Sequence, residues 1–429
     1  MSLKKNIFAN YVGVIGAALA PVLALPWYLD ILGPKQFGLV SFVVMFQGLL
    51  ALIDAGMSQA LVREIAIRFD STSNNQRRTG LLLYSFERIY WLFAIIVGCL
   101  ALFSADIIAK HWMNLDGLSI DSGKEAIYGA SAIFACQFPG SIYRSLLVGT
   151  QKQVTLNSLM LVFTLIRHIG GVLVLMKWPM FFTYLFWQAL IALIESLVRG
   201  VFAWRTIGVK RNQCKWDTTE LRPVWRLVVG LSGVTFLGAL TAQMDRVILS
   251  RMVTIEQLGY YAIAATVATG VLQLIYPLTQ AILPKAIQLR SSAIELYKIN
   301  IKLMGVLIIL VGLGVVGFMT MGQWVLTLWL RNPLTVTEVY PLLMVLLIGT
   351  ALNALYNVGY MNWIIHEKIN RVFQVNGLSL VLSIILIPYF VTSLGTIGAA
   401  FGWLTINTIG LILSLEWIKK SPIMEDIKS

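Results

Sequence analysis

The sequence predicts an all-α polytopic membrane protein with twelve transmembrane helices, arranged as two parallel six-helix lobes around a central cavity. Three observations predict this fold class. Hydrophobic residues make up 58% of the 429 residues and charged residues only 12%, whereas about 25% of the residues of a soluble domain are charged. The apolar residues form long runs, and basic residues gather in alternate connections between these runs. This composition excludes a soluble enzyme, a nucleic-acid-binding module and a disordered scaffold.

A helix needs roughly 20 mostly apolar residues to cross the hydrocarbon core of a bilayer. Twelve segments reach this length, and turn residues such as Gly33-Pro34, Asp116-Gly117 and Asn332-Pro333 separate neighbouring segments. In chain order, we expect the spans at residues 8–30, 37–60, 81–104, 124–148, 154–176, 180–204, 224–250, 258–283, 302–329, 339–365, 370–392 and 395–418.

The basic residues predict the orientation of these spans. With the N-terminus in the cytoplasm, the inside segments carry 22 of the 33 basic residues and the outside segments carry seven. An excess of Lys and Arg on the cytoplasmic side is the usual signal for orientation. We therefore expect a multi-pass protein with both termini in the cytoplasm. The net charge of +13 is then explained by topology, and no nucleic-acid partner is expected.

The chain is predicted to have two halves. The longest basic connection follows the sixth span, so we expect an N-terminal six-helix lobe at 1–204, a basic cytoplasmic linker at 205–223 and a C-terminal six-helix lobe at 224–429. A weak repeat supports the division, because Gln36-Phe37-Gly38 and Gln257-Leu258-Gly259 open corresponding spans. Each half has an even number of spans, so the repeats are expected to be parallel, with the substrate cavity at their interface.

Several short motifs resemble a known family. They lie mostly in the first 65 residues, and a further stretch from Leu240 to Gly259 resembles the matching entry into the second lobe. The motifs are Asn6-Ile7-Phe8-Ala9-Asn10-Tyr11-Val12-Gly13, Pro26-Trp27-Tyr28-Leu29, Leu32-Gly33, Phe37-Gly38-Leu39, Asp54-Ala55-Gly56-Met57-Ser58, Arg63-Glu64, Asp245-Arg246 and Leu258-Gly259-Tyr260-Tyr261. They resemble the Wzx-type O-antigen and polysaccharide-biosynthesis flippases of the multidrug/oligosaccharidyl-lipid/polysaccharide exporter superfamily.

The resemblance implies a function. A member of this family exports an undecaprenyl-diphosphate-linked oligosaccharide unit from the cytoplasmic to the periplasmic leaflet of the bacterial inner membrane. The implied partners are that lipid-linked oligosaccharide, the membrane lipids, and the polymerase and chain-length regulator of the same biosynthetic route. No enzymatic activity and no cofactor are implied.

Ionisable residues inside spans are costly and usually face a cavity or each other. Four such arginines lie in the first lobe: Arg88, Arg144, Arg167 and Arg199. The planar fork of arginine binds phosphate oxygens bidentately, so we expect these four residues to bind the diphosphate. The alternative is snorkelling to the inner headgroups, which suits Arg167 least because it lies near the middle of its span.

Three acidic residues are candidates for coupling or gating. Glu195 lies four residues before Arg199, so the two form either a structural ion pair or a proton-coupling site that responds to substrate. Asp54 belongs to the family-like motif near the inner end of the second span, where a structural or gating role is expected. Glu87 is expected to neutralise part of the charge of its neighbour Arg88.

Neutral polar groups complete the predicted site. Gln137, His168, Asn353 and Asn357 are expected to contact the diphosphate or the sugars. The three histidines are far apart and the three cysteines have no metal-ligand spacing, so neither a metal site nor a cofactor is predicted. The chain also lacks a glycine-rich phosphate loop with an adjacent lysine, so we expect an ion gradient rather than ATP to drive transport.

Other functions stay open at this point. One is a cation-coupled multidrug antiporter of the same superfamily, although arginines outnumber acids four to two in the first-lobe cluster of Glu87, Arg88, Arg144, Arg167, Glu195 and Arg199. Another is a peptidoglycan-precursor flippase, although such proteins usually carry two further helices. A third is a membrane-embedded O-antigen polymerase, for which the longest predicted external connection, residues 105–123, is short.

Overall fold

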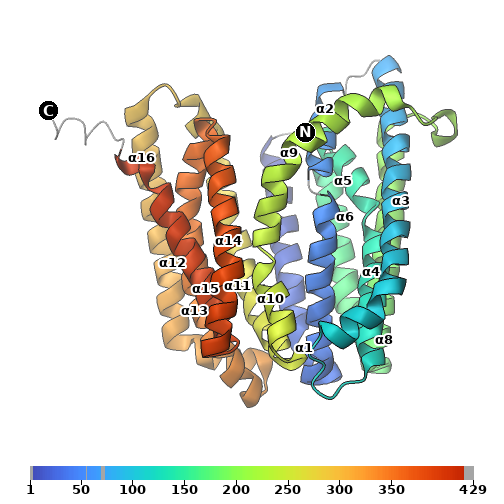
Figure 1. Ribbon diagram of the computed structural model, residues 1–429. Helices are drawn as coiled ribbons and strands as arrows, with labels where there is room; N and C mark the ends of the chain where they lie inside the picture. Colours follow the sequence, from blue (N-terminus) through green and yellow to red (C-terminus); the bar gives the residue numbers. More distant parts are fainter. Residues whose placement is uncertain (1–2, 55, 69–72, 420–429) are drawn as a thin grey trace. The chain divides into compact units, whose positions relative to one another are not determined.

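The computed structural model describes residues 3–54, 56–68 and 73–419. Throughout this part of the chain the regular structure is helical, with no strand. The chain divides into two compact units. Unit 1 comprises Met1–Leu240 and Thr254–Glu256, and unit 2 comprises Thr241–Val253 and Gln257–Ser429. Figure 1 shows that each unit is a bundle of long helices.

The helices of unit 1 alternate between long spans and short breaks. In chain order they are α1 (Leu3–Leu50), the 3-10 turn η1 (Ala51–Asp54), α2 (Met57–Arg68), α3 (Ser73–His111), α4 (Ile120–Gln137), α5 (Gly140–Gly149), α6 (Gln153–Leu165), the π-helical turn η2 (Ile166–Gly170), α7 (Gly171–Lys177), α8 (Phe181–Ile207), the 3-10 turn η3 (Arg211–Gln213) and α9 (Thr218–Thr241).

Unit 2 consists mainly of uninterrupted spans. Its helices are α10 (Met244–Met252), α11 (Ile255–Gln288), α12 (Ala293–Leu330), α13 (Pro333–Ile365), α14 (Ile369–Leu394), α15 (Ile397–Ser414) and α16 (Glu416–Lys419). Most are long although α11, α13 and α14 contain prolines, which membrane-spanning helices tolerate. Gly395 separates α14 from α15 with a positive φ of 68°.

In the part of the chain that the structure describes, the twelve predicted spans fall mostly on helices. Within the described ranges, nine helices are long and apolar enough to cross a membrane. The helix α1 contains the first predicted span and residues 37–50 of the second, and it bends at Gly33, where φ is 76°. The second predicted span continues in η1 and α2. The fourth predicted span is divided between α4 and α5, and the seventh between α9 and α10. The protein is therefore an all-α polytopic membrane protein.

The outer surfaces of the spans are apolar. Phe103 on α3 is 82% exposed and Leu313 on α12 is 70% exposed. A soluble protein rarely exposes such side chains over a contiguous surface. On membrane-spanning helices, such exposed apolar side chains are suited to contact with lipid.

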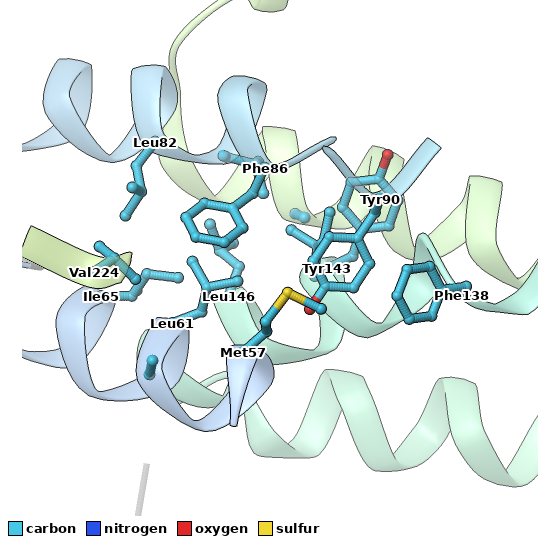
Figure 2. Packing of buried hydrophobic residues seen from close by; sticks show 14 of the residues in the cluster. Met57, Leu61, Ile65, Leu82, Phe86, Tyr90, Phe138, Tyr143, Leu146 and Val224 are labelled. Atoms are coloured by element: carbon cyan, nitrogen blue, oxygen red, sulfur yellow. The ribbon is translucent and has the colours of Figure 1, made fainter. Parts of the chain in front are cut away.

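Each unit has its own packed apolar cluster. In unit 1 the cluster joins α2, α3, α5 and α9, as Figure 2 shows for Leu61, Phe86, Leu146 and Val224. In unit 2 a second cluster joins α11, α12 and α13. Lipid tails are as apolar as these side chains, so close van der Waals packing rather than escape from solvent stabilises the parts within the membrane.

The predicted linker at 205–223 is only partly irregular. The helix α8 ends at Ile207, and residues 218–223 already form the beginning of α9. Glu220 in this segment is 8% exposed and accepts hydrogen bonds from Arg68 and from Arg78, the latter at 2.7 Å. Residues up to Leu240 belong to unit 1, whereas the sequence assigns 224–250 to the second lobe. The lobe boundaries stay a prediction.

Candidate functional site

A buried carboxylate in unit 1 accepts hydrogen bonds from two arginines. Glu195 and Arg199 lie one turn apart on α8, and Arg167 lies in η2. The Nη2 atom of Arg167 is 2.7 Å from Oε2 of Glu195, and Nη2 of Arg199 donates to Oε1. The exposed fractions of the three side chains are only 15%, 11% and 12% for Arg167, Glu195 and Arg199. The ion pair predicted from the spacing is present, and Arg167 joins it from another helix.

This cluster holds more positive than negative charge. One carboxylate is shared by two guanidinium groups, and Arg144 on α5 also acts electrostatically on Arg199. Within the described residues, Nε of Arg199 is buried without a hydrogen-bond partner. A buried charge without full compensation is costly. The site therefore favours an anionic ligand whose oxygens accept hydrogen bonds.

The turn η2, which carries Arg167 and is called the arginine turn below, is held by two aromatic side chains. Trp187 Nε1 donates to the carbonyl oxygen of Arg167 at 3.1 Å, and Tyr28 Oη donates to that of His168 at 3.0 Å. Irregular backbone at membrane depth requires such partners. Short π-helical segments inside helices are frequent at functional sites. The two aromatic residues thus fix the point from which the Arg167 side chain starts.

Two consecutive glycines make room for these aromatic residues. A Cβ atom on Gly170 would lie 2.6 Å from Cζ2 of Trp187, and one on Gly171 would lie 2.7 Å from Oη of Tyr28. Both distances are too short for any real side chain. The Gly170-Gly171 pair therefore allows Tyr28 on α1 and Trp187 on α8 to come close enough to hydrogen-bond to η2.

Further buried polar atoms lie near this turn. The ring of His168 lies 6.3 Å from that of Tyr28, and its Nδ1 is buried. Gln188, which follows Trp187 on α8, is 5% exposed and its Nε2 is buried. Neither nitrogen has a hydrogen-bond partner in the part of the chain that the structure describes. Both can hydrogen-bond to a polar ligand.

Glu87 lies in a different cluster, together with three donors. It is 2% exposed, and its Oε1 accepts from Tyr143 Oη at 2.7 Å and Trp204 Nε1 at 2.9 Å. Its Oε2 accepts from Nε of Arg211 at 2.9 Å. This carboxylate joins α3, α5, α8 and η3. Its predicted coupling role stays a prediction, and its contacts are those of a structural cross-link.

Arg88 does not pair with its neighbour Glu87. Successive residues of a helix point about 100° apart, so Arg88 lies on the exposed face of α3 while Glu87 is buried. The Arg88 guanidinium lies over the ring of Tyr84, 4.7 Å from its centroid, and bonds to its hydroxyl. The expected neutralisation of Arg88 by Glu87 is thus not found, because Glu87 pairs with Arg211.

Asp54 ends the short turn η1 between α1 and α2. Its carboxylate accepts from Ser58 Oγ at 2.6 Å and from the hydroxyl of Tyr90 on α3. Arg144 acts on it electrostatically. Asp54 therefore connects the end of α1 with α3, and its gating role stays a prediction.

Gln137 and Arg144 are exposed on the broken fourth span. The break at Phe138-Pro139 separates α4 from α5, and Ser196 Oγ donates to the carbonyl oxygen of Cys136 at 2.6 Å. This bond supplies a partner where the proline interrupts the helical pattern. Both predicted binding residues remain accessible to a ligand.

Asn353 and Asn357 form an amide network inside unit 2. Asn353 Nδ2 donates to Asn407 Oδ1 at 2.6 Å, and Asn357 Nδ2 donates to Asn353 Oδ1 at 3.1 Å. Asn407 in turn donates to the carbonyl oxygen of Trp403 at 2.7 Å. The network is neutral, so it suits hydroxyl groups better than a phosphate. Its contact with sugars stays a prediction.

Some structural partners could not be found from sequence. Trp204 and Arg211 lie 117 and 124 residues from Glu87, so no spacing rule connects them. Tyr28 belongs to the family-like motif, but no pattern indicates that Tyr28 and Trp187 both bond to the turn η2. The Gly170-Gly171 pair, which follows Arg167 by three residues, is a signal that could indicate a close approach at this turn.

Comparison with known proteins gives a consistent assignment. Residues 3–290 match the family described as "Polysaccharide biosynthesis protein". A curated relative named "Putative O-antigen transporter", from Shigella flexneri, is 22% identical, and the alignment covers 97% of this chain and 98% of the relative.

Solved structures share the fold. The lipid II flippase MurJ in an inward closed conformation has a TM-score of 0.72 at 16% identity, covering 98% of this chain and 88% of MurJ. An inward-facing multidrug resistance MATE family transporter of the MOP superfamily has a TM-score of 0.71 at 14% identity, covering 93% of each chain. The Vibrio cholerae MATE transporter VcmN has a TM-score of 0.62 at 12% identity, covering 97% and 96%. At these identities, the likeness shows the fold alone.

Proposed function

Because this chain belongs to the polysaccharide biosynthesis protein family, we propose that it is a flippase for undecaprenyl-diphosphate-linked O-antigen or polysaccharide repeat units. In this proposal it moves the lipid-linked unit from the cytoplasmic to the periplasmic leaflet of the bacterial inner membrane, with both termini in the cytoplasm. It is a transporter rather than an enzyme. The polymerase and chain-length regulator are its proposed partners.

The buried Arg167–Glu195–Arg199 cluster is the observation that carries this proposal. A diphosphate brings two or more negative charges and several acceptor oxygens. The cluster offers a surplus of positive charge and an unpartnered Nε on Arg199. Guanidinium groups bind phosphate oxygens in pairs of parallel hydrogen bonds. An organic cation would instead be repelled by this surplus.

The shared carboxylate suggests how binding and release alternate. When the diphosphate binds Arg167, that arginine leaves Glu195. Glu195 then keeps its other partner, Arg199, which lies on the same helix. This exchange of partners at Glu195 would couple alternating access to an ion gradient.

The sugars require a separate, neutral surface. The exposed Gln137 and the half-buried His168 lie in unit 1, and Asn353 and Asn357 lie in unit 2. Amide groups and neutral imidazole both donate hydrogen bonds to hydroxyl groups and accept hydrogen bonds from them, and they carry no charge. The proposed division of labour is that arginines hold the diphosphate and these groups contact the glycan.

The test is the sidedness of a labelled substrate in proteoliposomes. Undecaprenyl-diphosphate-oligosaccharide is compared with a peptidoglycan precursor on the same lipid and with an organic cation, each with and without a proton gradient. We expect protein-dependent movement of the oligosaccharide lipid alone, faster with the gradient. Movement of the precursor or the cation instead would assign the chain to another transport function.

The variant Arg167→Gln shows in the same assay whether a loss of transport comes from the binding site or from misfolding. We expect at least a tenfold loss of transport with normal protein yield, since a charge-assisted hydrogen bond is worth about 1.5–3 kcal/mol. Lys177→Gln is the matched control, because Lys177 is also a cation in this region but is exposed and lies over Trp178. Equal transport by the two variants would contradict the proposed role of Arg167.

A further inference from the structure

An open cavity in unit 1 lies away from the arginine cluster. Its volume is about 970 Å³, and α2, α3 and the first half of α9 line it. Figure 1 shows this part of α9 passing across the end of unit 1 where α2 lies, at a steep angle to α3. Three arginines line the cavity: Arg63 from α2, and Arg222 and Arg226 from α9.

These three arginines are not neutralised within the described residues. None of them forms an ion pair there, and all three are exposed. Glu64 also lines the cavity, but its carboxylate accepts a hydrogen bond of 2.6 Å from Arg68. The cavity therefore has a cationic lining with its own acid already engaged.

The first half of α9 has the two faces of an interfacial helix. Glu220, Val224 and Val228 are buried against unit 1. On the other side, Arg222 and Arg226 are exposed and Trp225 is 45% exposed between them. Tryptophan beside arginine is typical of the headgroup layer, where the ring and the guanidinium reach different depths.

The position in the predicted topology selects a lipid as the ligand. Arg63, Arg222 and Arg226 all lie in segments assigned to the cytoplasmic side by the distribution of basic residues. Basic pockets between helices on that side bind phosphate-bearing lipid headgroups. A cavity of this size accommodates a headgroup, and Trp225 supplies an apolar surface beside it.

We propose that Arg63, Arg222 and Arg226, with Trp225, form a binding site for the phosphate group of a lipid in the cytoplasmic leaflet. The site lies outside the arginine cluster of the proposed transport path and does not depend on the transported glycan. Its occupant bridges α2 and the beginning of α9. Bound lipid therefore stabilises the packing of the first half of α9 against the rest of unit 1.

The test measures lipid binding by the purified full-length protein in detergent with native mass spectrometry. The probes are phosphatidylglycerol, the zwitterionic phosphatidylethanolamine, undecaprenyl diphosphate and inorganic phosphate. We expect a phosphate-bearing lipid of net negative charge to bind preferentially. The stronger of phosphatidylglycerol and undecaprenyl diphosphate identifies the natural source. Equal affinity for inorganic phosphate would overturn the assignment to a lipid.

Three triple variants test the residues. In R63Q/R222Q/R226Q we expect the affinity for the preferred anionic lipid to fall by about a hundredfold. Each basic residue near an anionic headgroup contributes about a factor of five to this affinity. R77Q/R205Q/K215Q removes three cations from other predicted cytoplasmic positions and should change binding less than twofold. The variant R63K/R222K/R226K keeps the charge at the three positions. Retained binding by this variant shows that the loss in R63Q/R222Q/R226Q is not due to misfolding. Equal binding by wild type and R63Q/R222Q/R226Q would refute the site.

Discussion

Arg167 and Glu195 are joined by a hydrogen bond of 2.7 Å although they lie 28 residues apart and on different helices. Glu195 also bonds Arg199 within α8. The two arginines are therefore not equivalent. Arg199 is kept beside Glu195 by the helix itself, whereas the distance from Arg167 to Glu195 depends on how η2 packs against α8.

Replacement of the shared carboxylate should destabilise unit 1. In Glu195→Gln, two buried guanidinium groups lose their charged partner, so we expect a loss of about 3–5 kcal/mol in unfolding free energy. Thermal unfolding in detergent measures it. The double variant R167Q/E195Q removes one of the two charges and should recover part of the loss. Strict additivity of the two single changes would show that the pair is not energetically coupled.

The Glu87 cluster has no surplus of charge, because Glu87 pairs with the single cation Arg211, but it also predicts an effect on stability. Glu87→Ala leaves Tyr143, Trp204 and Arg211 without their acceptor, and we expect a loss of about 3 kcal/mol. Glu367→Ala is the control, because Glu367 pairs with Arg290 but its side chain is 74% exposed. Surface ion pairs contribute at most about 1 kcal/mol. Similar losses in both variants would argue against a cross-link at Glu87.

Gly171 predicts a steric effect at the arginine turn. In Gly171→Ala the new methyl group would lie 2.7 Å from Tyr28 Oη, so we expect overpacking to cost about 1–3 kcal/mol. In Gly305→Ala nothing lies within 4 Å of the new methyl group. There, alanine should stabilise α12 by about 0.5–1 kcal/mol. Melting temperatures that shift in the same direction would contradict this difference.

Asp217 predicts a pH dependence outside the membrane. Hydrogen bonds from the Thr219 hydroxyl and backbone amide lower the pKa of Asp217, which precedes α9. Because the folded-state pKa is depressed, the stabilisation is present above about pH 4, the usual value for aspartate, and is lost as pH falls further. Asp217→Asn keeps a capping side chain but does not titrate. Its melting temperature should fall less steeply between pH 5 and pH 3 than that of the wild type. Parallel curves would exclude this contribution.

The span positions could be predicted because each depends on a local property. Twenty apolar residues must form a helix in a bilayer, so the run from 302 to 329 alone predicts α12. The Glu195–Arg199 pair could be predicted for the same reason, since a four-residue spacing brings two side chains together on any helix.

The remaining parts of the site depend on contacts between distant segments. The partner of Glu87 is Arg211 rather than the adjacent Arg88 because the helix turns these neighbours to different faces. The second partner of Glu195 comes from η2, and no single-helix pattern indicates which helix lies beside α8. Spacing rules describe one helix at a time, so they could not predict either pairing.

The π-helical turn also has a consequence for how this protein tolerates insertions and deletions. One residue added to an α-helix rotates everything after it by about 100°, and the wider turn at Ile166–Gly170 absorbs such a residue locally. Removal of one residue there would restore a regular α-helix and leave α7 in the same register with α6, so that Gly171 would still lie beside Tyr28. Related sequences that differ by one residue at this point should therefore keep their small residues on the same side of α7. An alignment that places a gap there marks the loss of the turn rather than a change in a loop.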